Sequence, residues 1–255
     1  MKDKEKILKI MDEHYPELAV MLIKEILTED EEEPTKKNKI LKVINVFETG
    51  KIEGDYSKIS IFSDGPNNIK QITYGVRQTT EFGNLPDLIK DYVGSNGEFS
   101  EDLAPYKDRI GQKPSLHPNS EFKRLLKLAG EDPVMRKCQD KFFDEKYWKR
   151  AENWFKENGF TSPLSMLVIL DSYVHSGSIL GFLRKRFSER PPASGGDERK
   201  WIEEYVNTRH KWLATHSSRP ILRNTIYRTN CFKDIIRRGD WGLEEPINAN
   251  GIIVD

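Results

Sequence analysis

The chain has 255 residues, of which 41 are Lys or Arg and 41 are Asp or Glu, so its formal net charge at pH 7 is zero. This length can bury a sizeable core, and the neutral total gives no overall field that would attract nucleic acid or an anionic membrane. No apolar run approaches the roughly 20 residues that cross a bilayer. We therefore expect a soluble protein, with neither nucleic acid nor membrane as partner, whose function depends on a local arrangement of side chains.

The first segment, MKDKEKILKIMDEHYPEL, has acidic residues where a signal peptide needs an uninterrupted apolar region, so it is predicted to be an amphipathic helix. No export signal is visible, and the compartment stays open. Cys138 and Cys231 lie in separate charged stretches without Cys-x-x-Cys or Cys/His spacing, and His175, His210 and His216 show no ligand spacing. We expect no metal site, and the sequence does not establish a disulfide.

A second helix is predicted over KKNKILKVINVFETG, because Leu41, Ile44 and Glu48 recur at helical spacing and Gly50 is a typical stop. The next two runs, DYSKISIF and IKQITYG, alternate apolar and polar residues around a Gly-Pro-Asn turn, which predicts a β-hairpin. NLPDLIKDYV then returns to helical spacing. The order predicted here is helix, hairpin, helix.

Residues 94–118 are rich in Gly, Ser, Asp and Pro, and we predict no regular structure for them. Helical patterns follow in VMRKCQDKFFDEKYWKRAENWFKENG, SPLSMLVILDSYVHSG, ILGFLRKRF, DERKWIEEYVNTRHKWLA and NTIYRTNCFKDIIRRG. The sequence therefore predicts a mainly α, α+β protein with a small hairpin sheet. We expect a single domain over 1–255, with lobes of approximately 35–95 and 120–245 that are linked by 95–119.

Three acids around the hairpin, Glu48, Asp64 and Glu81, are candidates for paired-carboxyl chemistry. Cleavage of a glycosidic bond needs an acid and a second carboxylate about 5 to 10 Å apart. Glu48 closes an apolar stripe, where desolvation raises the pKa of a carboxyl group, so it is the candidate acid. Asp64 belongs to an Asp-Gly turn and is already explained by turn chemistry.

The candidate base is Glu81, which we expect in a wetter place among Thr79, Thr80 and Asn84, whose polar groups would position a water. Spacing alone does not establish such a site, because an isolated Glu at a helix end is more often a solvated or capping residue.

Asp171 lies inside a nearly unbroken apolar helix, where an ionised carboxylate is costly unless it is paired. The arginines available in later helices are Arg209 and Arg228. A purely structural ion pair explains this pattern as well as a catalytic one does. The sharper hypothesis is a network that ends on Glu48, fixes its orientation and tunes its titration.

These segments together resemble the family 46 chitosanases, relatives of the lysozymes. The resemblance rests on the FE that closes a helix, the hairpin ending in ITYG, the acid before LPDLIKDYV, and the later stretches YWKRAENWFKENGFTSPLSMLVILDSYVHSG, WIEEYVNTRHKWL and YRTNCFKDIIRRGDWGL. It covers about residues 47–93 and 142–243, which is over half of the chain. It implies a lysozyme-like, two-lobed fold with the hairpin sheet beside a catalytic cleft.

The resemblance also implies endo-hydrolysis of the β-1,4 bonds of chitosan with inversion, by a monomer that needs no cofactor and belongs to a mostly secreted family. Glu48 then matches the general acid and Glu81 the general base. A register closer to phage-type lysozymes selects Asp64 as the alternative base, with Thr73 as its neighbour, and a peptidoglycan substrate. A non-catalytic glycan-binding module is the remaining alternative. Further residues implied are the supporting Asp171, Arg209 and Arg228, the water-positioning Thr79 and Thr80, and the substrate-binding Asp64, Tyr74, Arg77, Gln78 and Asn84.

Overall fold

The computed structural model describes residues 36–76 and 79–255. The chain forms two compact units, Met1–Leu41 and Lys42–Asp255. In the first unit only residues 36–41 are described, and they are helical, so the helix predicted over MKDKEKILKIMDEHYPEL lies outside the described residues. The helical stretch ends at residue 49, as predicted from the spacing of Leu41, Ile44 and Glu48. The second unit contains all the candidate site residues.

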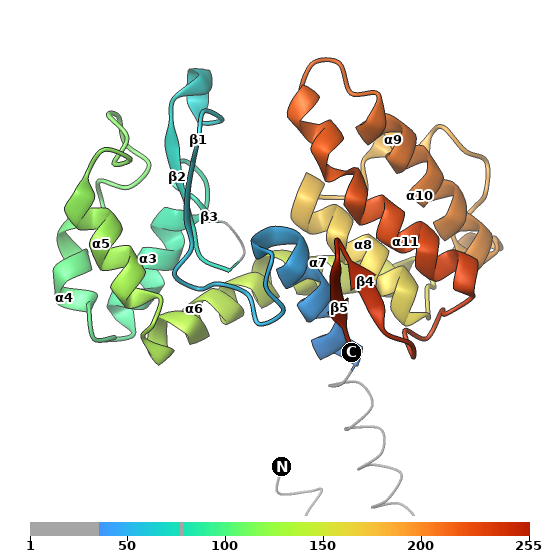
Figure 1. Cartoon of the computed structure of the whole chain (residues 1–255), viewed down its shortest axis with the longest axis horizontal. Helices are drawn as coiled ribbons and strands as arrows, with labels where there is room; N and C mark the ends of the chain where they lie inside the picture. The colour runs from blue at the N-terminus through green and yellow to red at the C-terminus, as the bar shows by residue number, and fades with distance from the viewer. Residues whose placement is uncertain (1–35, 77–78) are drawn as a thin grey trace, which may run out of the picture. The chain divides into compact units, whose positions relative to one another are not determined.

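The predicted hairpin is confirmed, and it belongs to an antiparallel sheet of β1 (Ile59–Phe62), β2 (Gln71–Tyr74) and β3 (Thr79–Thr80), in that order. Figure 1 shows these strands together. Because side chains alternate along a strand, Ile72 and Tyr74 share one face of β2, and both are fully buried in the apolar core. Gln71 and Thr73 occupy the other face.

The helix predicted over NLPDLIKDYV is also confirmed, as α3 (Leu85–Gly94). The prediction that residues 94–118 lack regular structure is wrong, because α4 (Ser100–Leu103) and a 3-10 turn (Ala104–Tyr106) lie there. This segment is held by apolar packing, since its side chains share one core cluster with the hairpin and the helices around it. That cluster includes Ile72, Tyr74, Leu85, Leu88, Leu103, Ile110, Leu116, Phe122, Leu126 and Met135.

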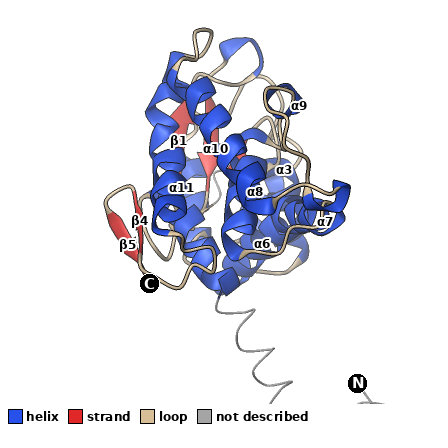
Figure 2. Ribbon diagram, turned by 90° about the vertical axis from the view of Figure 1, so that its right-hand side faces the viewer, coloured by secondary structure: helices blue, strands red, loops and turns tan. Residues whose placement is uncertain are grey.

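Helices make up most of the described chain beyond residue 119 (Figure 2). After α5 (Ser120–Ala129), the long helical pattern from Val134 appears as α6 (Pro133–Phe143), a π turn (Asp144–Trp148) and α7 (Lys149–Glu157). The remaining helices are α8 (Pro163–Ser176), α9 (Gly181–Arg184), α10 (Glu198–Ala214) and α11 (Ile226–Arg238). Helix α10 packs against α8 and α11, so residues far apart in the sequence meet there. The described part is thus mainly α with a small antiparallel sheet, as predicted, while the division into lobes stays a prediction.

A second hairpin, β4 (Ile247–Ala249) paired with β5 (Ile252–Val254), was not predicted. Its turn holds Asn250 and Gly251, both at positive φ, which is the Asn-Gly chemistry of a tight hairpin turn. Cys138 and Cys231 are both buried free thiols, and burial raises the pKa of Cys231 to about 12. None of the helices in the described ranges is long and apolar enough to span a membrane.

Candidate active site

Glu48 lies in the last turn of the helix that ends at residue 49, and three side-chain contacts hold that turn in place. The Tyr227 hydroxyl donates to the carbonyl oxygen of Phe47 at 2.8 Å. The Lys58 ammonium donates to the carbonyl oxygens of Glu48 and Thr49 at 3.2 and 3.3 Å. Because the last carbonyls of a helix have no partner within it, these donors satisfy groups that would otherwise need water. The backbone that carries Glu48 is therefore fixed from two directions.

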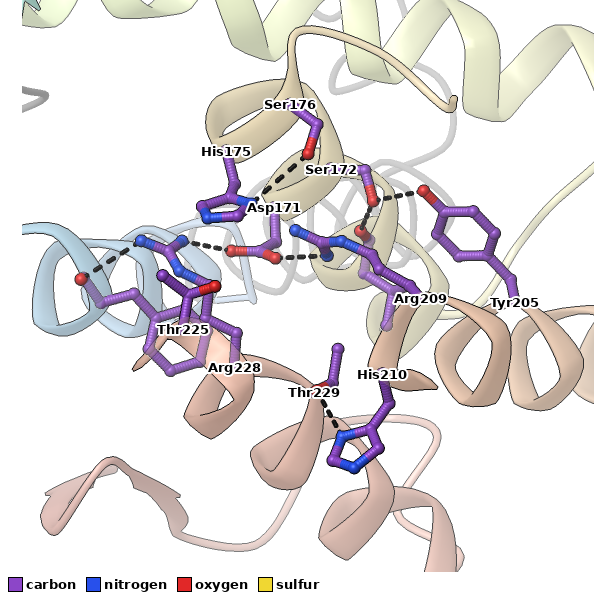
Figure 3. Close-up of polar contacts among 12 residues, drawn as sticks. Asp171, Ser172, His175, Ser176, Tyr205, Arg209, His210, Thr225, Arg228 and Thr229 are labelled. Atoms are coloured by element: carbon purple, nitrogen blue, oxygen red, sulfur yellow. Dashed lines mark hydrogen bonds and ion pairs between the residues drawn. The ribbon is translucent and has the colours of Figure 1, made fainter. Parts of the chain in front are cut away.

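The carboxyl group of Glu48 is the outer end of a chain of buried ion pairs. Arg228 Nη2 lies 2.6 Å from Glu48 Oε1, and Arg228 Nη1 lies 2.7 Å from Asp171 Oδ1. Arg209 Nη1 holds the other oxygen of Asp171 at 2.6 Å, so Asp171 sits between two guanidinium groups (Figure 3). The Asp171 side chain is fully buried, whereas the Glu48 side chain is 15% exposed. The exposed end of this series of ion pairs is thus Glu48, the carboxyl group predicted to react.

When Glu48 is ionised, the charges of this network compensate one another, with two carboxylates against two guanidinium groups. Burial alone would raise the pKa of Asp171, but the attraction of Arg209 and Arg228 outweighs it and the pKa is lowered. Burial would likewise lower the pKa of Arg228, and the negative charges of Glu48 and Asp171 raise it instead. Arg228 is therefore a fixed cation that orients Glu48.

Two further side chains near the network, those of His175 and Tyr147, were not predicted to belong to the site. His175, next to Asp171 in Figure 3, has its pKa lowered to about 3 by burial and by Arg228 and Arg209, so its ring is neutral around pH 7. Burial raises the pKa of Tyr147, and the negative charge of Glu48 raises it further, while Asn84 acts in the opposite direction.

Glu81 does not have the wet surroundings expected of a base. Its side chain is fully buried. One carboxylate oxygen accepts from the Ile72 backbone N–H at 3.1 Å and from the Ser115 hydroxyl at 2.7 Å, and the other accepts from the Leu116 backbone N–H at 2.6 Å. The carboxylate thus ties the segment around Ser115 to β2, and its burial differs from the wet, polar surroundings that were predicted for it.

Asp64, the alternative base, is exposed in the turn that follows β1. Gln71 Nε2 donates to its Oδ1 at 2.9 Å. Gln71 is itself buried and accepts from the Phe82 backbone N–H at 3.0 Å through Oε1. Asp64 is therefore a carboxylate that faces solvent and is held on one side only by contacts within the described residues.

The other predicted site residues divide between the core and the sheet. The structure contradicts substrate binding by Tyr74, because its side chain is fully buried in the apolar core. Thr79 is also buried, and its hydroxyl donates its one proton to the Tyr74 carbonyl at 2.9 Å within the sheet. Thr80 pairs across the sheet with Thr73. Arg77 and Gln78 lie outside the described residues.

Thr73 has an unusual feature, because its buried hydroxyl oxygen has no hydrogen-bond partner within the part of the chain that is described. A buried hydroxyl without a partner costs free energy, which makes it a site where a water would be stabilised. Thr73 lies two residues along β2 from Gln71 and on the same face, and Gln71 is the residue that contacts Asp64.

In residues 36–76 and 79–255 no group of three His, Cys, Asp or Glu side chains is arranged to hold a metal ion.

A family profile and a curated relative assign the chain to the same kind of protein. The profile of glycosyl hydrolase family 46 matches residues 42–247. A curated chitosanase of Bacillus subtilis strain 168 is 24% identical over 230 residues, which cover 84% of this chain and 81% of that protein.

Solved structures give the same fold. The native chitosanase of Bacillus subtilis MY002 is similar with a TM-score of 0.73 and 20% identity, over 86% of this chain and 98% of that chain. The chitosanase of Gynuella sunshinyii in complex with chitotetraose is similar with a TM-score of 0.74 and 20% identity, over 86% and 96% of the two chains. Fold and site thus define a mainly helical protein that presents carboxyl groups beside a small sheet. By its sequence, the chain belongs to glycosyl hydrolase family 46.

Proposed function

We propose that this protein is an endo-acting chitosanase that hydrolyses the β-1,4 bonds of chitosan with inversion at the anomeric carbon. The observation that carries the proposal is the partly exposed Glu48 carboxyl group, which a buried Arg228–Asp171–Arg209 chain orients in a member of glycosyl hydrolase family 46. The similar chitosanases described above support chitosan as the substrate. Chitosan is a polycation, which suits a site whose reacting groups are carboxyl groups.

In the proposed reaction, Glu48 donates its proton to the glycosidic oxygen as the bond from that oxygen to the anomeric carbon breaks. A second carboxylate removes a proton from a water on the opposite face of the sugar, and the water oxygen forms the new bond to the anomeric carbon. Arg228 stays protonated throughout and keeps Oε1 of Glu48 in place. The leaving sugar carries the proton from Glu48 on the oxygen that had formed the bond. At the end of the reaction Glu48 has lost one proton and the second carboxylate has gained one.

We assign the second carboxylate to Asp64 in preference to Glu81. Glu81 is fully buried and its oxygens accept from three donors, which is the setting of a structural acceptor rather than of a base that is open to a water. Asp64 is exposed and is contacted at one oxygen by Gln71. The unpartnered Thr73 hydroxyl, on the same face of β2 as Gln71, then takes the water-positioning role that had been expected of Thr79 or Thr80.

The first experiment tests the activity itself. We expect the full chain to release reducing ends from chitosan, to shorten it to oligosaccharides rather than single residues, and to leave peptidoglycan intact. Loss of a general acid or base typically costs about 10²- to 10⁴-fold, so Glu48→Gln is expected to lower kcat by that factor while the melting temperature changes little. Activity on peptidoglycan but not on chitosan would replace the proposed substrate. Wild-type kinetics in the Glu48→Gln variant would remove Glu48 from the mechanism.

The second experiment separates the two candidate bases. Asp64→Asn is expected to fold normally and to lose activity by about 10²-fold or more. Glu81→Gln is expected to lose about 1 to 3 kcal/mol of unfolding free energy, because a buried acceptor of three hydrogen bonds is weakened, yet to keep kcat per folded molecule. Activity assays are therefore paired with urea unfolding. An inactive but stably folded Glu81→Gln beside an active Asp64→Asn would reverse the assignment.

A further inference from the structure

The side chain of Gln71 connects the interior of the protein to Asp64. Its exposed fraction is 5%, and both ends of its amide are engaged. Oε1 accepts from the Phe82 backbone N–H at 3.0 Å, and Nε2 donates to Asp64 Oδ1 at 2.9 Å. A backbone N–H is only a donor and a carboxylate only an acceptor, so this orientation of the amide is the one in which both contacts are hydrogen bonds. Reversal of the amide would break both.

Phe82, Gln71 and Asp64 form a hydrogen-bonded relay, and its inner end, the backbone N–H of Phe82, is held in place because Phe82 follows directly on Glu81. The Glu81 backbone N–H donates to the carbonyl oxygen of Ile72 at 2.8 Å, and the Ile72 backbone N–H donates to the Glu81 carboxylate at 3.1 Å. Ser115 and Leu116 hold the same carboxylate from the other side. The amide of Gln71 is thus set by backbone next to Glu81, which makes two hydrogen bonds to β2 and two to the segment around Ser115.

We propose that Gln71 is a positioning residue for the base of the reaction, which fixes Oδ1 of Asp64 through an amide donor and directs the other oxygen toward the water. The inference rests on the proposed function and deepens it. An exposed turn would otherwise allow the Asp64 side chain to populate several rotamers, and each lost rotamer must be offset by a contact. A single neutral donor restricts the carboxylate without neutralising it, which a base requires.

The first test removes the amide. Gln71→Met keeps the length of the side chain and loses both hydrogen bonds, so kcat is expected to fall about tenfold, with KM nearly unchanged because Asp64 acts on the water. Gln139→Met is the matched control. Gln139 is an equally buried glutamine that accepts from the Val76 backbone N–H and donates to the Tyr56 carbonyl, each at 3.0 Å, and it does not touch Asp64. This control is expected to lower the melting temperature and leave kcat unchanged.

The second test uses the pH profile, which a merely structural role would not move. Gln71→Glu keeps an acceptor for Phe82 and places an oxygen where Nε2 donated, so the new carboxyl group and Asp64 share a proton. While one proton remains, the new side chain donates to Asp64 as the amide did. When that proton leaves, two anions face each other. Loss of this proton ends the positioning of Asp64, so activity is expected to fall as the pair loses its proton, and the alkaline limb of kcat is expected below that of wild type with activity retained on the acidic side.

The charged groups around this relay bear on that profile. Among the described residues, Glu81 lies beyond Phe82 and is held by its three donors, while Lys70 precedes Gln71 and is exposed. Lys70→Gln in the Gln71→Glu background therefore separates a contribution of Lys70 from that of Asp64. Persistence of the shifted limb in that double variant supports the proposal.

The outcomes separate this inference from the proposed function. An inactive wild-type chain overturns both. With an active wild type and an inactive Asp64→Asn, an unshifted limb in Gln71→Glu together with wild-type kcat in Gln71→Met overturns the positioning role alone. Equal losses of kcat in Gln71→Met and Gln139→Met also overturn it, because general destabilisation would then explain the effect.

Discussion

Arg228 is the residue on which the geometry of the site depends most directly. Its guanidinium group binds Asp171 through Nη1 and Glu48 through Nη2, and Nη2 also donates to the Phe47 carbonyl at 3.3 Å. A planar guanidinium group supplies several donors in fixed directions, whereas the ammonium group of lysine is a single compact charge. A lysine therefore cannot hold both carboxylates in their present positions.

The prediction is that Arg228→Lys folds but loses about 10- to 100-fold in kcat on chitosan, a range that corresponds to roughly 1.4 to 2.7 kcal/mol of transition-state stabilisation. Steady-state kinetics with urea unfolding measures both properties. Arg223→Lys is a matched control, because Arg223 is exposed and donates to a backbone carbonyl away from Glu48. Equal kcat values in the two variants would contradict the role given to Arg228.

At this scale the sequence predicts some contacts and misses others for physical reasons. A carboxylate in an apolar helix requires a cation, so Asp171 with Arg209 and Arg228 could be inferred from composition and period alone. The surroundings of Glu81 could not, because its donors come from Ser115 and Leu116, more than thirty residues away. Turn chemistry explains why Asp occurs at position 64, yet it does not decide whether that carboxylate also reacts.

At the scale of elements, helix α8 carries Asp171, and its first turn is capped by a carboxylate from α10. Glu198 accepts from the Ser162 backbone N–H at 2.8 Å, from the Ser165 hydroxyl at 2.6 Å and from the Thr161 hydroxyl at 2.8 Å. These donors include backbone groups that have no partner within the helix, and the negative charge also suits the helix dipole. The cap thus joins the starts of two helices that hold opposite partners of the buried ion pair.

The cap predicts a pH-dependent stability. Burial alone would raise the pKa of Glu198, but its hydrogen bonds, that of Ser165 foremost, lower it below the ordinary 4.5. Because the pKa of Glu198 is lower in the folded state than in the unfolded state, its ionised form stabilises the fold. This stabilisation is fully present at a pH above the ordinary pKa and is lost as the pH falls through the lowered pKa. We expect Glu198→Gln to unfold more easily than wild type by about 1 to 3 kcal/mol at pH 7, and the difference to shrink below about pH 4.

Urea unfolding at a series of pH values checks this expectation, with Glu203→Gln as the control, because Glu203 is an exposed residue of the same helix. A Glu198→Gln difference that stays constant from pH 7 to about pH 3 would rule out the ionised cap.

The helices and strands themselves were mostly predictable, since the hairpin and the helices follow from local periodicity. Segment 95–119 was not, because Leu103, Ile110 and Leu116 are ordered by distant core contacts rather than by a local pattern.

At the scale of the molecule, Asp171 connects helices that are far apart in sequence. Through Arg209 it joins α8 to α10, and through Arg228 it joins α8 to α11 and to the end of the helix that carries Glu48. The chain as a whole is electrically neutral, so this organisation owes nothing to net charge. It follows that the network supports folding as well as the site, and that the two effects must be separated by experiment.

Removal of one partner of a buried ion pair leaves an uncompensated charge and typically costs about 3 to 5 kcal/mol, a large share of the roughly 5 to 15 kcal/mol that stabilises a protein. We expect Asp171→Asn to show such a loss in urea, whereas Asp234→Asn, which breaks surface pairs with Arg237 and Arg238, hardly changes stability. Arg209 has two buried nitrogens, Nε and Nη2, without partners in the described chain, so its own burial is costly once Asp171 is neutral.

The double variant Asp171→Asn/Arg209→Met therefore leaves the Arg228 and Glu48 charges to compensate each other, and it is expected to recover part of the stability lost in Asp171→Asn. Its kcat is expected to stay low, because Arg228 no longer has Asp171 to fix it. Additive losses in this double-mutant cycle would show that the two residues act independently, against the geometry that joins them. Recovery of stability without recovery of kcat would separate the folding role of the network from its role in orienting Glu48.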